Sequence, residues 1–152
     1  MELRSIQRIL VPTDFSDPSN EALATAMAFA SAFGGKLDLV HVALAVSYVL
    51  PPPVDFATLP FDMTKSLEQA TTGLANEESR VRAAGLACES ATLFGRPDTE
   101  IVARATATKA DLIVMGTHGR SGLSHALMGS VAERVVRHTP CPILIVPQRH
   151  PA

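Results

Sequence analysis

The sequence predicts a single α/β domain built on an open, five-stranded parallel sheet with helices on both faces. Two observations predict it: the alternation of segment types along the chain and the length of the chain. Short runs rich in β-branched residues alternate with longer alanine-rich segments along the whole chain, and each parallel strand pair needs a helical crossover of this kind. The length, 152 residues, corresponds to one domain, since domains hold roughly 100 to 200 residues. We therefore expect one domain over residues 1–152.

The first half of the chain begins with a strand at Ile6–Pro12. A helix at Pro18–Phe33 follows, with Asp17 as its N-cap and Pro18 in its first turn, and Gly34-Gly35 ends it. The second strand is expected at Lys36–Val42. The next stretch, Ala43–Asp62, holds four prolines and is predicted to be an irregular crossover loop.

The second half continues the alternation. Leu67, Leu74 and Val81 form one apolar stripe, which predicts a helix closed by Gly85. The remaining apolar runs are strands and the segments between them are helices. The predicted helices are Met63–Ala84, Asp98–Thr108 and Ser130–His138, and the predicted strands are Leu86–Phe94, Leu112–Met115 and Ile143–Val146.

Charge and cysteine content exclude several classes of protein. Lys and Arg total 13 against 15 Asp and Glu, a net charge of −2, so nothing attracts a polyanion and we expect no nucleic-acid partner. Cys88 and Cys141 form no zinc-binding pair and are expected to be reduced thiols. The amino-terminal residues lack the apolar core of a signal peptide, and Leu39–Leu50 is shorter than the roughly 17 residues that span a bilayer. We expect a cytoplasmic protein without a membrane segment.

The strongest motif follows the fourth predicted strand. It begins with Gly116-Thr117-His118-Gly119 and, after nine intervening residues, ends with Gly129-Ser130. The pattern is G-x2-G-x9-G-S, between a buried strand and a helix. Gly116 and Gly119 allow positive φ and close approach of a ligand, and the N-terminus of the helix after Gly129 favours anions. This pattern predicts a phosphate-binding loop. It is neither a P-loop nor a dinucleotide fingerprint, because the G-K-[ST] and G-x-G-x2-G patterns are absent.

A purely structural explanation of the same residues stays open. Ser130 and Glu133 have the spacing of a capping box, which would start the helix without any ligand. Arg120 either neutralises a phosphate or lies in solvent. His118 and His125, with Asp14, suggest a metal only weakly, because no helical H-x3-H pair exists, so we predict no metal site.

A second candidate segment follows the first strand. In doubly wound sheets, ligands bind outside the carboxyl ends of the strands, at the switch point in strand order. Pro12, Thr13 and Asp14 stand at such an end, with the Asp14 carboxylate available to the crevice. The alternative for Asp14 is a simple cap or turn residue.

These residues together resemble the universal stress protein family. The resemblance rests on Ile9-Leu10-Val11-Pro12-Thr13-Asp14-Phe15-Ser16, Leu39-Val40-His41-Val42, Gly95-Arg96-Pro97, Ile113 to Arg120, Gly129-Ser130-Val131 and Pro140 to Val146. It covers essentially the whole chain. The complete glycine motif is typical of the ATP-binding branch of that family, so the resemblance implies that this protein binds ATP.

The resemblance also implies roles for individual residues. Asp14 would lie against the ribose and adenine, and backbone groups of Val42 against the adenine edge. Met115, Gly116 and Gly119 would line the ribose and phosphates, and Gly129, Ser130 and Val131 would donate to the phosphates. Mg²⁺ would be held by those phosphates rather than by a protein cage.

The implied function is a stress-response or signalling module whose nucleotide occupancy changes its partners or its dimer. The alternative is an enzyme on the same fold, a slow ATPase or a nucleotidyl transferase. No Walker-type lysine, Ser-His-Asp order or water-activating base accompanies the motif, which favours the binding module. We therefore predict no catalytic residues. A third possibility, a structural dimer that has lost its ligand, is weakened by the intact glycine motif.

The last predicted strand, Ile143-Leu144-Ile145-Val146, carries no charge. In a Rossmann-like sheet of strand order 3-2-1-4-5 this strand lies at an edge, where an uncovered apolar strand promotes aggregation. Pairing with a twofold copy of itself would cover it, so we expect a homodimer, as the family resemblance also implies. The alternative is an edge protected only by helices and by Pro142 and Pro147.

Overall fold

The sheet has the predicted composition and strand order. In the computed structural model, which describes residues 5–43, 61–118 and 128–149, five parallel strands lie in the order β3-β2-β1-β4-β5. They are β1 (Arg8–Pro12), β2 (Lys36–Ala43), β3 (Cys88–Phe94), β4 (Leu112–Gly116) and β5 (Ile143–Val146). β1 is central and pairs with β2 on one side and β4 on the other. The expected single-domain α/β class is therefore confirmed.

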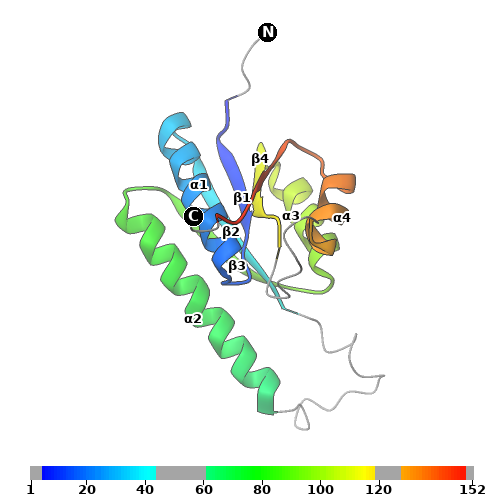
Figure 1. Ribbon diagram of the computed structural model, residues 1–152. Helices are drawn as coiled ribbons and strands as arrows, with labels where there is room; N and C mark the ends of the chain where they lie inside the picture. The colour runs from blue at the N-terminus through cyan, green and yellow to red at the C-terminus, as the bar shows by residue number, and fades with distance from the viewer. Residues whose placement is uncertain (1–4, 44–60, 119–127, 150–152) are drawn as a thin grey trace.

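Helices of the described residues cover both faces of this sheet (Figure 1). They are α1 (Asp17–Phe33), α2 (Phe61–Ala83), α3 (Pro97–Thr108) and α4 (Ser130–His138). α1 and α2 share one hydrophobic cluster with the sheet, and α3 and α4 share the other. None of the helices in the described part of the chain combines the length and the apolar character needed to cross a membrane.

β1 shows why the sheet is covered on both faces. Its side chains alternate, so Ile9 and Val11 enter the cluster with α1 and α2, whereas Leu10 enters the cluster with α3 and α4. All three are fully buried. A strand with two buried faces is apolar at successive positions instead of at every second one, as residues 9–12 of β1 are.

Several element boundaries differ from the predicted ones. Asp17 is the first residue of α1 and not its N-cap; the N-cap is Ser16, whose backbone is extended and whose side chain accepts from the Ser19 N–H. Asp17 instead contributes a negative charge in the first turn, where the helix dipole favours it. Both ends of α4 and of β5 match the prediction, and the remaining differences are one or two residues, the usual uncertainty at fraying ends.

The predicted crossover loop is shorter than expected at both ends. Ala43 is the last residue of β2, and α2 begins at Phe61, so the predicted irregular segment 43–62 loses residues at both ends. Residues 44–60, with their prolines, lie outside the described residues.

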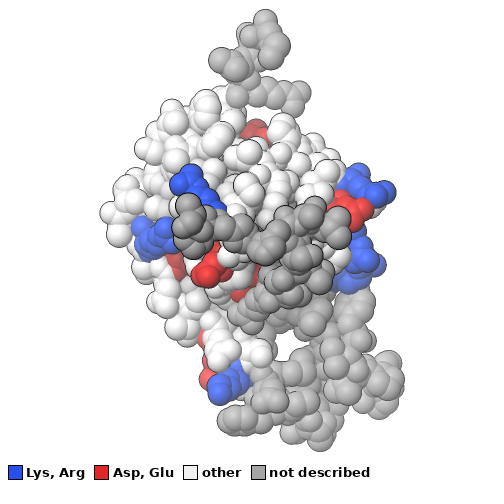
Figure 2. All heavy atoms as spheres, in the orientation of Figure 1, with Lys and Arg blue, Asp and Glu red and all other residues white. Residues whose placement is uncertain are grey.

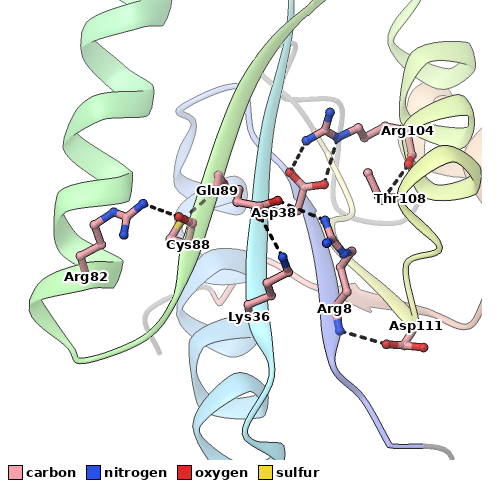
Figure 3. A network of polar contacts seen from close by, with 9 residues as sticks. All are labelled: Arg8, Lys36, Asp38, Arg82, Cys88, Glu89, Arg104, Thr108 and Asp111. Atoms are coloured by element: carbon pink, nitrogen blue, oxygen red, sulfur yellow. Dashed lines mark hydrogen bonds and ion pairs between the residues drawn. The ribbon is translucent and has the colours of Figure 1, made fainter.

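One ion pair anchors α3 to the sheet (Figure 3). Asp38 of β2 is fully buried, and its two carboxylate oxygens accept from Arg104 Nε and Nη2 of α3, each at 2.9 Å. The Arg104 side chain is 26% exposed, so its outer edge reaches solvent. The two parallel hydrogen bonds satisfy a carboxylate that burial alone would strongly disfavour.

The charged side chains elsewhere are dispersed. On the face seen in Figure 2, acidic and basic side chains of the described residues lie beside one another in small groups, with uncharged surface between the groups. This matches the near balance of charge in the sequence, a net of −2. On that face no field of one sign is concentrated.

We expect Arg104→Ala to lower the free energy of unfolding by about 3 kcal/mol, the lower end of the range for breaking a buried ion pair, because Asp38 would keep an uncompensated buried charge. Urea denaturation measures the change. Arg137→Ala, which breaks an exposed pair with Glu133, is the matched control and should cost only about 0.3–0.5 kcal/mol. An equal loss of unfolding free energy in the two variants would contradict the conclusion that Asp38 is a buried charge that needs Arg104 as its partner.

Candidate functional site

A cleft of about 520 Å³ opens at the carboxyl ends of the central strands. The chain leaves β1 toward α1 on one face of the sheet, and β4 is followed along the chain by α4 on the other face. The two connections therefore diverge between neighbouring strands, which is the switch point where doubly wound sheets bind ligands. The volume lies within the 300 to 1,000 Å³ typical of small-molecule pockets.

The structure brings most of the predicted site residues together around this cleft. Eleven of the thirteen line it: Pro12, Thr13, Asp14, Val42, Met115, Gly116, Thr117, His118, Gly129, Ser130 and Val131. Gly119 and Arg120, and also His125, lie outside the described residues. The binding roles of the eleven stay predictions, but their convergence from β1, β2, β4 and α4 is a property of the fold.

Sequence reasoning missed six residues that line the same cleft, namely Ser19, Val40, His41, Pro97, Ile101 and Ala132. Val40 and His41 precede the predicted Val42 on β2, and Ala132 follows the predicted Val131 on α4, so the sequence neighbourhood already pointed to them. Pro97 and Ile101 belong to the first turns of α3. Only the packing of α3 across β2 brings those two to the cleft.

Asp14 performs the structural role that the sequence left as an alternative. Its Oδ1 accepts from the Ser16 N–H at 3.1 Å and from Ser19 Oγ at 2.6 Å, and it also contacts the Ser16 hydroxyl. The carboxylate therefore fixes the first turn of α1. Because Asp14 also lines the cleft, the turn and the cleft share one charged group.

The N-terminus of α4 faces the cleft without a side-chain cap. Gly129 is the N-cap residue, and it makes no side-chain cap hydrogen bond. The capping box that the sequence left as an alternative does not form: Ser130 is already the first helical residue, and Glu133 forms an ion pair with Arg137. The Gly129 N–H is itself donated to the Thr117 carbonyl at 2.7 Å. The donors left for an anion are therefore the N–H groups of the first helical turn, which begins at Ser130.

The two described motif glycines are required by close packing and not by positive φ. Positive φ occurs at Gly34, Gly85 and Gly95, so the expectation of positive φ at Gly116 is wrong. A Cβ on Gly116 would lie 3.0 Å from backbone and side-chain atoms of Pro18, and one on Gly129 would lie 3.1 Å from the Thr117 oxygen. Gly116 thus lets the first turn of α1 approach the end of β4.

His118 follows this close contact. Its Nδ1 lies 3.0 Å from Thr117 Oγ1, and its Nε2 is buried without a hydrogen-bond partner among the described residues. The described part of the chain holds no cluster of three or more His, Cys, Asp or Glu residues with metal-binding geometry. His118 therefore carries an unsatisfied polar atom at the wall of the cleft.

A buried glutamate of α2 supports the floor of the site. Glu77 is 8% exposed, and its Oε1 accepts from the Thr13 hydroxyl at 3.0 Å. Oε2 is buried and has no partner within the described residues. Burial raises the pKa of Glu77, and nearby Asp14 raises it further, while the Thr13 hydrogen bond and Arg80 offset part of the rise.

The fold and the site together define a Rossmann-like α/β domain whose cleft lies at the β1–β4 switch point and includes the N-terminus of a helix without a side-chain cap. A sequence model of the universal stress protein family matches residues 5–147. The chain belongs to this family.

Individual relatives agree with that assignment. Universal stress protein MJ0531 of Methanocaldococcus jannaschii is 36% identical over 140 residues, which are 92% of this chain and 81% of the other. Among solved structures, that of MJ0577 from the same organism is 28% identical, covers 97% of this chain and 99% of its own, and superposes with a TM-score of 0.81. A universal stress protein crystallised with cAMP is 27% identical, covers 95% and 99%, and has a TM-score of 0.70.

The raised pKa of Glu77 leads to a pH-dependent prediction. A carboxyl whose pKa is higher in the folded than in the unfolded state favours folding when protonated, and that advantage is lost as pH rises from the ordinary value of about 4.3 through the raised value. Glu77→Gln keeps the shape without the charge. We expect the variant to be more stable than wild type at pH 7 and equal to it below pH about 4, as measured by urea denaturation across pH. A pH-independent difference would contradict the buried, ionised carboxylate.

Proposed function

We propose that this protein binds ATP in the cleft at the β1–β4 switch point and acts as a stress-response or signalling module whose nucleotide occupancy alters its partners or its dimer. The proposal also assigns the protein to the cytoplasm. It treats ATP as a bound ligand and assigns no catalytic residue.

The observation that carries the proposal is the chemical asymmetry of the cleft. One wall is apolar, with Val40, Val42 and Ile101, and suits a base. Another is the first turn of α4, whose uncapped N–H groups and helix dipole suit phosphate. Asp14 provides a carboxylate at the end of β1 that can accept from hydroxyl groups. Base, sugar and phosphate each meet a suitable surface within one cleft.

The family relationship supports the same ligand class. A universal stress protein that is 27% identical to this chain was crystallised with cAMP, an adenine nucleotide. We assign the ribose and adenine to Asp14 and to the backbone of Val42. The ribose and phosphates are assigned to Met115, Gly116, Gly119 and the first turn of α4. The phosphates would hold Mg²⁺, which usually keeps most of its water and needs few protein ligands.

We further propose a homodimer through β5. β5 lies at the edge of the sheet, and its four side chains are only half-buried. The Pro142 carbonyl accepts from Ile113 of β4, and the Val146 carbonyl accepts from Thr117, directly after β4. The alternating backbone groups of Ile143 and Ile145 therefore face the open side of the strand. An antiparallel copy of β5 would pair with those groups.

Asp14→Ala should weaken ATP binding by about 1.5–3 kcal/mol, the range for a hydrogen bond to a charged group. Binding of inorganic triphosphate, which lacks base and ribose, should change less. Isothermal titration calorimetry measures both. Asp17→Ala is the matched control, because Asp17 is an exposed carboxylate in the same turn and does not line the cleft. An equal loss of ATP and triphosphate would place Asp14 at the phosphates, and unchanged ATP affinity would remove it from the site.

Ile145→Pro should convert the dimer into a folded monomer. Proline removes an N–H that faces the open edge and leaves the hydrogen bonds to β4 intact. Strands tolerate proline at such positions, where the N–H points away from the neighbouring strand. Sedimentation velocity at micromolar concentration measures the mass, and circular dichroism reports the fold. Ile145→Thr keeps the N–H and the β-branched shape and should remain dimeric. A wild-type protein that sediments as a monomer contradicts this interface.

A further inference from the structure

Thr13 connects the cleft to two different elements of the fold. Its backbone N–H donates to the Val40 carbonyl of β2 at 2.8 Å, and its hydroxyl donates to Glu77 of α2 at 3.0 Å. The same hydroxyl accepts from the Phe15 N–H at 3.1 Å. The Thr13 hydroxyl is thus used both as donor and as acceptor, and both bonds fix the turn that follows β1.

Phe15 adopts a backbone conformation that bulky residues rarely adopt. Its φ is +65°, which costs free energy for any residue other than glycine unless the surroundings hold it there. The Phe15 ring packs on the His41 ring with 4.8 Å between centroids, and His41 Nδ1 lies 2.9 Å from the Thr13 carbonyl oxygen. Packing and hydrogen bonds from β2 and α2 therefore hold the turn in a strained form.

Gly73 of α2 makes room for that ring. A Cβ at position 73 would lie 2.7 Å from the Phe15 ring, closer than such atoms approach. Glycine in the interior of a helix costs about 1 kcal/mol relative to alanine. Gly73 lies four residues before Glu77, so both are on the face of α2 that meets the turn.

Glu77 is a costly choice for its position. The same face of α2 carries the buried residues Ala70, Leu74 and Val81, and a carboxylate with one unpartnered oxygen packs less favourably there than an apolar side chain. Its Oε1 instead accepts a hydrogen bond from the Thr13 hydroxyl. Packing alone would therefore favour an apolar residue at position 77. The hydrogen bond to the turn after β1 explains why a glutamate stands there instead.

We propose that Gly73 and Glu77 are positioning residues of the nucleotide site: α2 holds the Thr13–Phe15 turn in its strained form through the Gly73 gap and the Glu77 carboxylate, and this form presents Asp14 and His41 to the ligand. The inference rests on the proposed binding of ATP. Because linkage is reciprocal, ATP binding must in turn strengthen the attachment of α2 to the turn. A residue of the second crossover thereby sets the affinity of a cleft that it does not line.

Calorimetry with ATP tests the positioning role. Glu77→Ala should weaken ATP binding about tenfold, equivalent to 1.4 kcal/mol, and Glu77→Gln should restore affinity to within about twofold because its amide oxygen still accepts from Thr13. Val81→Ala is the matched control: Val81 lies one turn further along the same buried face, so it should lose stability and keep wild-type affinity. Equal ATP affinity in Glu77→Ala and wild type overturns the proposal, as does an equal loss in Val81→Ala.

Gly73→Ala keeps every hydrogen bond and improves the helix propensity of α2, but it displaces the Phe15 ring. We expect ATP binding to weaken about fivefold to tenfold, because a displaced Phe15 ring no longer holds the strained turn, with α2 still folded by circular dichroism. This variant decides the question if Glu77→Ala does not fold. A Gly73→Ala protein with wild-type ATP affinity contradicts the proposal.

A ligand-free measurement separates this inference from the proposed function. Hydrogen exchange of the Phe15 N–H, which donates to Thr13, should accelerate about tenfold in Glu77→Ala, the same scale of loss, and stay near wild type in Val81→Ala. If wild type binds no ATP at millimolar concentration, the proposed function fails while this exchange result still decides whether α2 holds the turn. Unchanged exchange of Phe15 in Glu77→Ala overturns the hold itself.

Discussion

The structure depends on the pairing of β1 with both β2 and β4 at the centre of a parallel sheet. This pairing buries Ile9, Leu10 and Val11 completely and fixes the ends of β1 and β4 side by side. Because α1 and α4 cover opposite faces, the chain diverges at this point and a cleft remains. The sheet provides the rigid frame, while the polar groups of the cleft come from the turns that follow the strands.

Two buried acidic side chains attach the helical layers to this frame. Asp38 binds Arg104 and thereby fixes α3, whose first turns line the cleft with Pro97 and Ile101. Glu77 binds Thr13 and connects α2 to the turn after β1. Both acids cost free energy to bury and gain it back only in the correct arrangement. On this account α3, which lines the cleft, and α2, which does not, are both attached to the surrounding strands and turn by polar contacts as well as by packing.

The sequence predicted the fold class, the strand order and most of the cleft lining, because these follow from local patterns. Strands buried on both faces are continuously apolar, glycines mark close approaches, and the carboxyl ends of parallel strands converge. The capping errors have a different cause. Ser16 and Asp17 are both good cap residues, and only the backbone geometry of Ser16 selects it as the N-cap.

Long-range partners could not be predicted at all. Glu77 and Glu78 are adjacent in a helix, and the sequence presents them as one small acidic pair. The helix turns one toward Thr13, 64 residues away, and leaves the other in an ion pair with Arg82. Likewise, Gly116 signals a close approach, but its neighbour, Pro18 of α1, is evident only in the folded chain.

The central claim, that the cleft is a nucleotide site, is tested most directly by native mass spectrometry of the protein purified without added ligand and then mixed with ATP. The account predicts one adenine nucleotide bound per chain, either retained through purification or acquired on mixing. When the bound ATP is isotopically labelled, an excess of unlabelled ATP should displace it. A protein that stays at its ligand-free mass with millimolar ATP present would contradict it.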